Sequence, residues 1–278
     1  MIITRVCAAL GAAASAAFLS LSITAANAAD FGYGSVKDIP PPPVASSRTW
    51  YLRGTIGMKN PEPGSIFINE PSWSDHTVHH MDIKSTALFG FGIGVEANRW
   101  LRFDITGEYR GKQHFVAHDS YDNGGGCPGP GCGTNDYSAN LKSWLGLANA
   151  YIDLGTWRGI TPYVGGGVGM ASIEVMGFKD INPVQGAMFI ADSNKTTTNF
   201  AWALYAGLAM DVTPQWTLDF GYRYTDLGSV KTGTVSDAIG VSPSYSGMEI
   251  RDIVSHDLLF TARYRLGSHE PTYPVSFK

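Results

Sequence analysis

Residues 100–110 read WLRFDITGEYR and alternate between apolar and polar side chains with a period of two. Successive side chains of a β-strand point to opposite faces, so Leu101 and Phe103 share one face. Arg102 and Asp104 lie on the opposite face, which carries charges of both signs. The stretch also has the length of roughly 9–11 residues with which a tilted strand crosses a bilayer. It predicts a strand with one apolar and one charged face.

The same alternation recurs along the chain after residue 48. The segments expected as strands are 49–58, 86–96, 100–110, 143–154, 161–172, 200–212, 215–225 and 256–266. Their short connections are 97–99, 155–160 and 213–214, and their long connections are 59–85, 111–142, 173–199 and 226–255. Short turns at one end and long loops at the other are typical of a bacterial outer-membrane barrel. The sequence predicts an all-β fold, an eight-stranded antiparallel transmembrane β-barrel with up-and-down topology and four surface loops.

Composition narrows the class of protein further. The 278 residues carry 20 Lys+Arg against 24 Asp+Glu, a net charge of −4, so there is no basic excess to neutralise nucleic-acid phosphates. Charged residues make up 16% of the chain, below the roughly 25% of soluble domains. After the first thirty positions there is no run of 18 apolar residues, which excludes a helical membrane protein.

The polar faces of the expected strands predict an interior filled by charge pairs. A soluble sandwich would carry more lysine on such a face, whereas here arginine stands against acidic residues. The inward charged set is Arg53, Glu96, Arg102, Asp104, Glu108, Arg110, Asp153, Asp211, Asp219, Arg223, Arg263 and Arg265. Eight strands leave an interior only wide enough for side chains, and unpaired buried charges are costly. We therefore expect a closed network and little ion conductance.

Aromatic residues are placed as two belts, as expected where a barrel meets the two water interfaces. At the short-turn end lie Trp50, Trp100, Trp157 and Trp216. At the long-loop end lie Trp144, Trp202, Tyr109 and Tyr224. The apolar band between the belts is the surface that would contact lipid.

The N-terminal residues read as a secretory signal. Arg5 precedes an Ala-rich apolar stretch, and Ala26-Asn27-Ala28 is a small-residue cleavage site. An uncleaved helical anchor is the alternative. A polyproline run, Pro40–Pro43, marks the next segment as an extended lead-in. The expected organisation is a signal peptide at 1–28, a periplasmic Pro-rich lead-in at 29–48, the barrel at 49–266 and a C-terminal tail at 267–278.

Three stretches resemble a known family. They are TPYVGGGVG at 161–169, LDFGYRYTDLG at 218–228, and SHDLL at 255–259 followed by ARYRL at 262–266. They resemble the fifth, seventh and closing strands of the small porin-like outer-membrane β-barrel family, which is related to the OmpA membrane domain and the opacity-protein surface antigens. The resemblance covers roughly residues 48–266 and implies a barrel in the cell outer membrane. It does not imply one biochemical activity.

The closing strand departs from the family pattern at two places. Ala262 stands where the family carries Gly, and the strand ends on Leu266 instead of a chain-terminal Phe. The family's assembly machinery reads that terminal aromatic residue. Phe277 in the tail is the residue that could substitute for it.

Two motifs occur in enzymes or nucleotide-binding sites, but here they lie in structural surroundings that do not suit those functions. Glycines 90, 92 and 94 and the run 165–169 lie within expected strands, whereas a phosphate loop joins a strand to a helix. Ser255 and His256 are adjacent, so on a strand they point to opposite faces and are poorly placed to form a nucleophile–base pair. We expect no enzymatic activity and no cofactor.

Cysteines and histidines gather in the long connections. Cys127 and Cys132 are the cysteines left after removal of residues 1–28, and we expect a disulfide between them in an oxidising compartment. Free thiols or a metal pair are the alternatives. The histidines that could form a zinc or haem site are His76, His79, His80, His114 and His118. Polar loop residues without shared geometry are the favoured alternative.

The expected function is that of a structural or surface protein of the Gram-negative envelope. Its loops would serve envelope integrity and the recognition of host or phage ligands. Expected partners are outer-membrane lipid, lipopolysaccharide and the barrel-assembly machinery. A narrow porin for small solutes is the alternative, and loop-based metal or haem binding is the third hypothesis.

Overall fold

The computed structural model describes residues 48–68, 74–122, 132–184, 186–238 and 246–267. The chain divides into two units, Met1–Ala45 and Ser46–Lys278, and every described residue belongs to the second. The expected signal peptide therefore lies outside the described residues. So do the lead-in and the tail, apart from Arg48 and Gly267.

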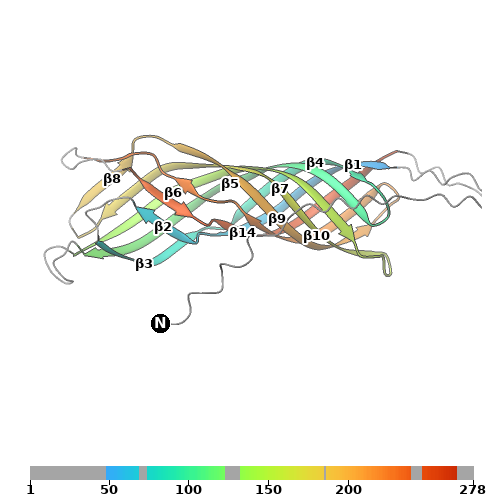
Figure 1. The fold of residues 1–278 in the computed structure, drawn as a ribbon, viewed down its shortest axis with the longest axis horizontal. Helices are drawn as coiled ribbons and strands as arrows, with labels where there is room; N and C mark the ends of the chain where they lie inside the picture. Colours follow the sequence, from blue (N-terminus) through green and yellow to red (C-terminus); the bar gives the residue numbers. More distant parts are fainter. Residues whose placement is uncertain (1–47, 69–73, 123–131, 185, 239–245, 268–278) are drawn as a thin grey trace, which may run out of the picture. The chain divides into compact units, whose positions relative to one another are not determined.

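Eight strands form a closed antiparallel ring, which confirms the expected barrel and its up-and-down topology (Figure 1). In ring order they are β1 (Thr49–Glu62), β4 (Thr86–Glu96), β5 (Leu101–Asp122), β6 (Cys132–Asp153), β7 (Ile160–Asn182), β9 (Lys195–Asp211), β10 (Trp216–Asp226) and β14 (Val254–Leu266). Each strand pairs with the next barrel strand in the chain, and β1 pairs with β14 to close the ring. The barrel therefore leaves no open edge within its ring.

The wall of the barrel is uneven in height. β5, β6 and β7 have 22, 22 and 23 residues, whereas β1, β4, β10 and β14 have 14, 11, 11 and 13. The expectation that 111–142 and 173–199 are loops was therefore wrong for much of both segments, because the long strands run on through them. We call this the long-strand end, and the opposite end, with the tight connections, the short-turn end.

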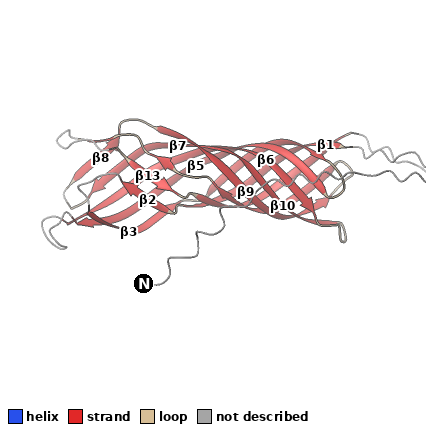
Figure 2. Ribbon diagram, viewed as in Figure 1, coloured by secondary structure: helices blue, strands red, loops and turns tan. Residues whose placement is uncertain are grey.

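Further short strands lie in the connections at the long-strand end (Figure 2). They are β2 (Ser65–Ile68), β3 (Ser74–Ile83), β8 (Ala187–Ala191), β11 (Val230–Lys231), β12 (Val235–Asp237) and β13 (Met248–Arg251). β3 pairs with β5, β8 pairs with β7, and β12 pairs with β8. These three short strands therefore extend the sheet that the long strands β5, β6 and β7 form beyond the barrel. The other three form a separate antiparallel sheet in the order β11-β13-β2, which we call the closing sheet.

β-Bulges exchange the inner and outer faces of two long strands. On β5 the register with β6 shifts between Arg110 and Gln113, and the buried positions pass from Arg110 to Phe115. On β7 the shift falls at Gly177, whose φ of +57° suits glycine, and Phe178 then turns inward. Residues that follow these bulges, such as Phe115 and Phe178, therefore face inward and join the apolar cluster.

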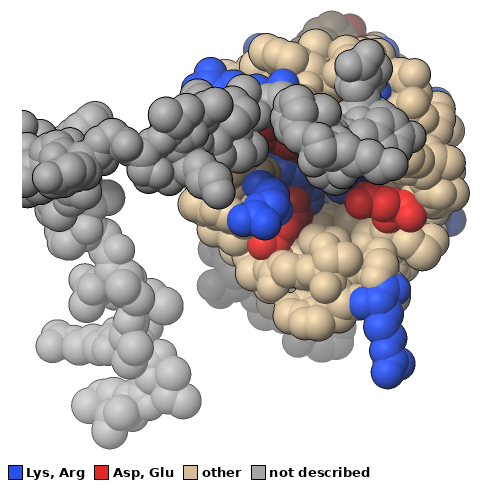
Figure 3. Space-filling view, turned by 90° about the vertical axis from the view of Figure 1, so that its right-hand side faces the viewer, with Lys and Arg blue, Asp and Glu red and all other residues tan. Residues whose placement is uncertain are grey.

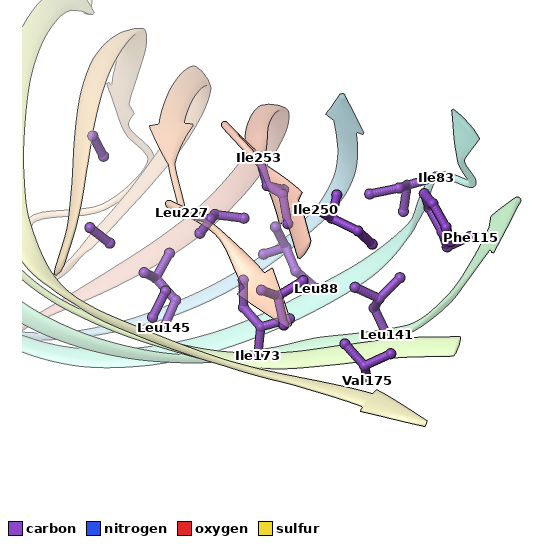
Figure 4. Packing of buried hydrophobic residues seen from close by; sticks show 14 of the residues in the cluster. Ile83, Leu88, Phe115, Leu141, Leu145, Ile173, Val175, Leu227, Ile250 and Ile253 are labelled. Carbon is purple, nitrogen blue, oxygen red and sulfur yellow. The ribbon is translucent and has the colours of Figure 1, made fainter. Parts of the chain in front are cut away.

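An apolar core fills the barrel at the long-strand end. The closing sheet contributes Val230, Met248 and Ile250, which are all buried. The barrel wall contributes Phe115 and Ile173 to the same cluster. Figure 4 shows side chains from the wall and from the closing sheet packed together. The closing sheet therefore acts as a lid that is part of the folded core.

The outer face of the barrel is apolar. Phe91, Ile105 and Phe220 are each about 59–66% exposed to the surroundings. Aromatic pairs lie near both ends of this band: Tyr109 with Trp144 at 5.0 Å, and Trp216 with Tyr264 at 5.0 Å between ring centroids. Within the described ranges, no helix is long and apolar enough to span a membrane. Apolar residues outside and charges inside suit a protein surrounded by lipid.

Candidate functional site

The centre of the charged interior is Arg223 on β10. Its guanidinium is fully buried and donates to both carboxylate oxygens of Glu108 at 2.6 and 2.7 Å. It also donates to Asp257 Oδ2 at 2.7 Å. Asp257 lies directly opposite Arg223 in the β10–β14 pairing, whereas Glu108 reaches it across the lumen from β5. The arginine thus joins opposite walls of the barrel by charge-assisted, forked hydrogen bonds.

A second arginine completes this central layer. Arg110 lies two residues after Glu108 on β5 and points to the same side. Its Nη1 and Nη2 donate to Asp257 at 2.9 and 3.0 Å, and Nη2 also donates to Ser255 at 2.7 Å. Two cations thereby face two carboxylates, all almost fully buried. We call Glu108, Arg110, Arg223 and Asp257 the central charge layer.

The next layer toward the short-turn end is built around Asp104. Arg53 Nη1 donates to its Oδ2 at 2.7 Å, and the Tyr51 hydroxyl donates to the same oxygen at 3.0 Å. Asn149 Nδ2 donates to the other oxygen at 2.8 Å. Arg53 also donates to the Tyr151 hydroxyl at 2.7 Å. Hydrogen bonds from two strands, β1 and β6, therefore compensate the buried carboxylate of Asp104 on β5.

Charge pairs continue to the short-turn mouth, where Glu96 and Asp211 are partly exposed. Arg263 donates to both oxygens of Asp219 at 2.8 and 3.0 Å, and Arg265 pairs with Glu96 and Asp211 at 3.0 Å each. Across the mouth, Arg102 pairs with Asp153 at 2.9 Å. The residues of these pairs that line a cavity of about 270 Å³ at the mouth are Glu96, Asp153, Asp211, Arg263 and Arg265. Figure 3 shows acidic and basic side chains meeting in the hollow at this end.

Glycines on β4 and β7 make room for large inward side chains. A Cβ on Gly92 would lie 3.0 Å from Arg53 Cγ, so this glycine makes room for the arginine side chain. A Cβ on Gly94 would instead collide with the ring of Tyr51, and one on Gly165 with the ring of Tyr151. The space left by glycine is thus occupied by protein side chains.

Gly94 provides a direct test of this packing. We expect Gly94→Val to destabilise the barrel by about 1–3 kcal/mol, because it displaces the Tyr51 ring and its bond to Asp104. Gly54→Val is the matched control, since a Cβ there has nothing within 4 Å. Urea unfolding in detergent measures both variants. Equal stability of the two would contradict the packing.

Each of the twelve charged residues singled out from the sequence has an oppositely charged partner within 4 Å. Arg110 pairs most closely with Asp257, a residue absent from that set. Lys59 was also left out; it is buried and donates to the Gly111 carbonyl at 2.9 Å. The strand alternation could have identified both residues. It places Asp257 on the same face as Arg263, and Lys59 on the same face as Arg53.

Ser255 and His256 lie on opposite faces of β14. The Ser255 hydroxyl is buried and donates to Asp257 Oδ1 at 2.5 Å. The His256 ring is on the outer face, where its Nδ1 hydrogen-bonds the Tyr222 hydroxyl at 2.5 Å. The Ser255 side chain therefore faces the interior of the barrel, and the His256 side chain faces its exterior.

The structure brings together only part of the histidine set. The ring centroids of His79 and His118 lie 5.8 Å apart. His80 is the residue paired with His118 in the β3–β5 register, and His114 lies four residues before His118 on β5. His79 hydrogen-bonds Ser120 at 2.7 Å, and His118 hydrogen-bonds Asp136 at 2.6 Å. No three His, Cys, Asp or Glu side chains in the described part of the chain are placed to hold a metal.

Three of the selected residues cannot be followed at the level of side chains. Cys127 lies outside the described residues. The side chains of Cys132 and His76 also lie outside what the structure describes. The expected disulfide and the contribution of His76 therefore stay predictions.

A closed ring of eight antiparallel strands, an apolar exterior and a charged interior define an integral β-barrel of the outer membrane. The family model for the outer membrane protein beta-barrel domain matches residues 11–246. The chain belongs to this family and is located in the outer membrane.

Relatives and solved structures agree with this assignment. Uncharacterised proteins of Brucella suis biovar 1 (strain 1330) and of Brucella melitensis biotype 1 (strain ATCC 23456) are each 31% identical over 223 residues, covering 74% of this chain and 77% of the relative. The crystal structure of the outer membrane protein OprG from Pseudomonas aeruginosa is similar with a TM-score of 0.50 and 13% identity. That similarity covers 80% of this chain and 98% of OprG, and it shows the fold.

Proposed function

We propose that this protein is a non-conducting structural and surface protein of the outer membrane. The main support for this proposal is that the interior of the barrel is filled at two levels. The central charge layer fills the lumen with paired side chains, and the apolar core beneath the closing sheet fills the long-strand end. A barrel of eight strands has little space beyond its own side chains.

The exposed parts of the long-strand end are where we place partner recognition. The outer faces of the extended strands are polar there, for example Lys142 with Glu174, whose charged atoms lie 2.9 Å apart. We propose that this end meets lipopolysaccharide and host or phage ligands, and that the barrel-assembly machinery inserts the chain. No catalytic role is part of the proposal, because Ser255 and His256 face opposite sides.

Electrical recording tests the closure of the interior. We expect the refolded full-length protein to give no steady current in planar lipid bilayers, because the central charge layer blocks the lumen. Incorporation is checked by recovering the folded barrel from the same membranes, and a known porin serves as the positive control. Stable porin-sized current steps would overturn the proposal and favour a narrow pore.

A deletion strain tests the envelope role independently of conductance. The proposal expects increased sensitivity to detergent with unchanged uptake of small solutes. Complementation with the wild-type chain should restore resistance. Slower solute uptake without detergent sensitivity would contradict it.

A further inference from the structure

The closing sheet replaces the wall that the short strands do not build. β2 follows directly on β1, β11 follows β10, and β13 precedes β14, so its three strands stand at the ends of three short barrel strands. Backbone hydrogen bonds join these junctions, from Gly64 to Arg251 at 3.0 Å and from Leu227 to Ile253 at 2.9 Å. The sheet therefore has an inner face toward the core and an outer face toward the surroundings.

The two faces of the closing sheet differ sharply in chemistry. Val230, Met248 and Ile250 are buried in the core. The alternate positions point outward, and these are Phe67 on β2, Lys231 on β11, and Glu249 and Arg251 on β13. The outer face thus carries an aromatic ring, two cations and one carboxylate.

These outward side chains line a cavity of about 440 Å³, a size usual for small-ligand pockets. The Arg251 guanidinium lies 4.2 Å from the centroid of the Phe67 ring and donates to Glu249 Oε2 at 2.9 Å. Lys231 Nζ is 3.9 Å from the same carboxylate, and its side chain is 62% exposed. Stacking and the ion pair hold the guanidinium in place while one positive charge remains in excess.

Glu249 acts as the fixed counter-charge of this pocket. The hydrogen bond from Arg251, together with the positive charges of Arg251 and Lys231, holds the pKa of Glu249 below its ordinary value. Its carboxylate therefore stays ionised at neutral pH and keeps both cations oriented. A ligand that brings its own negative charge would compete for the open sides of Lys231 and Arg251.

We propose that this pocket binds an anionic sugar, meaning a sugar ring that carries a phosphate or carboxylate group. The guanidinium of Arg251 and the ammonium of Lys231 would bind the anionic group. The exposed part of the Phe67 ring would pack against the apolar face of the sugar. This inference rests on the proposed surface function and assigns it a ligand class.

The pocket lies close to the membrane surface. The aromatic belt at the long-strand end includes Tyr224, whose ring centroid lies 5.5 Å from that of His256. Arg251 precedes His256 by five residues, which span at most about 17 Å of strand. Sugar headgroups of outer-leaflet glycolipids and soluble anionic glycans would therefore both be within reach of the pocket, and they share the chemistry that we propose it binds.

Titration calorimetry of the refolded full-length barrel in detergent tests the site, with glucosamine 6-phosphate as the probe. We expect saturable binding that Arg251→Gln weakens by about tenfold and Arg251→Lys weakens less. Phe67→Ala should weaken it as well, while inorganic phosphate and neutral N-acetylglucosamine should bind more weakly than the probe. Lys179→Gln, an exposed lysine elsewhere at the long-strand end, is the matched control and should bind normally.

Absence of saturable binding, or equal affinity in the wild type and Arg251→Gln, would overturn the proposal. A gel-mobility shift on heating confirms that each variant is folded. Competition by nanodiscs that contain lipid A, but not by phosphatidylcholine nanodiscs, is the result expected of a glycolipid ligand. Binding without such competition assigns the pocket to soluble glycans. A barrel that conducts but still binds the probe would refute the proposed function alone, whereas a closed barrel that does not bind would refute this inference alone.

Discussion

Replacing Arg223 by methionine is expected to lower the free energy of unfolding of the barrel by about 3–5 kcal/mol. Arg223 is fully buried and bonds Glu108 and Asp257 at once. Methionine keeps much of the volume but removes the charge, so two carboxylates would face Arg110 alone. The loss is large because it leaves a buried charge without compensation.

A charge-balanced variant separates this effect from a simple packing defect. Adding Glu108→Gln to Arg223→Met leaves one cation, Arg110, against one anion, Asp257, which already pair at 2.9 Å. We expect the double variant to be more stable than the single variant. If the double variant is instead less stable by the sum of both changes, charge balance is not what holds the layer together.

The mouth of the barrel offers the matched surface control. Arg265→Ala removes an arginine whose partner Asp211 is 58% exposed, and we expect a loss of only about 0–1 kcal/mol. Urea titration, read by the difference in gel mobility between folded and heated samples, measures all three variants. Equal losses for Arg223→Met and Arg265→Ala would contradict the assignment of a central layer.

Much of the barrel could be predicted because membrane strands obey a simple alternation. The residues 100–110 predicted a strand, and in the structure Arg102 and Asp104 do face inward while Phe103 and Ile105 face outward. Opposite charges on one face implied mutual pairing because a narrow interior offers no water to solvate them. The sequence could not say which arginine meets which carboxylate, since partners such as Arg223 and Glu108 come from distant strands.

The extended strands and the closing sheet at the long-strand end could not be predicted, for a different reason. The bulge after Arg110 and the one at Gly177 shift the phase of the alternation, so a period-two pattern stops where the strand continues. The closing sheet is made of strands of two to four residues, too short to show a period. Its apolar face is recognisable only once the barrel wall opposite to it is known.

The closing sheet should open when a charge is placed in its core. Ile250 is fully buried in the cluster beneath the sheet, and Ile250→Asp would put an unpaired carboxylate there. We expect trypsin to cleave at Lys231 and Arg251 about a hundredfold faster, because cleavage follows the population of the open state. Ile190→Asp, at a site that is 39% exposed on β8, is the matched control and should leave cleavage unchanged. Unchanged cleavage in Ile250→Asp would show that the sheet does not depend on this core.

The closing sheet and the central charge layer block the lumen one after the other, and this arrangement predicts how conductance depends on each. Ile250→Asp alone should still give no steady current, because the central charge layer remains intact between β5, β10 and β14. Current should appear only when Ile250→Asp is combined with Arg223→Ala and Glu108→Ala, a pair of changes that removes one cation and one anion together. Planar bilayer recordings of the single, double and triple variants measure this. Steady current from Ile250→Asp alone would mean that the charge layer does not close the lumen. A silent, folded triple variant would mean that the neighbouring layer around Asp104 closes it as well.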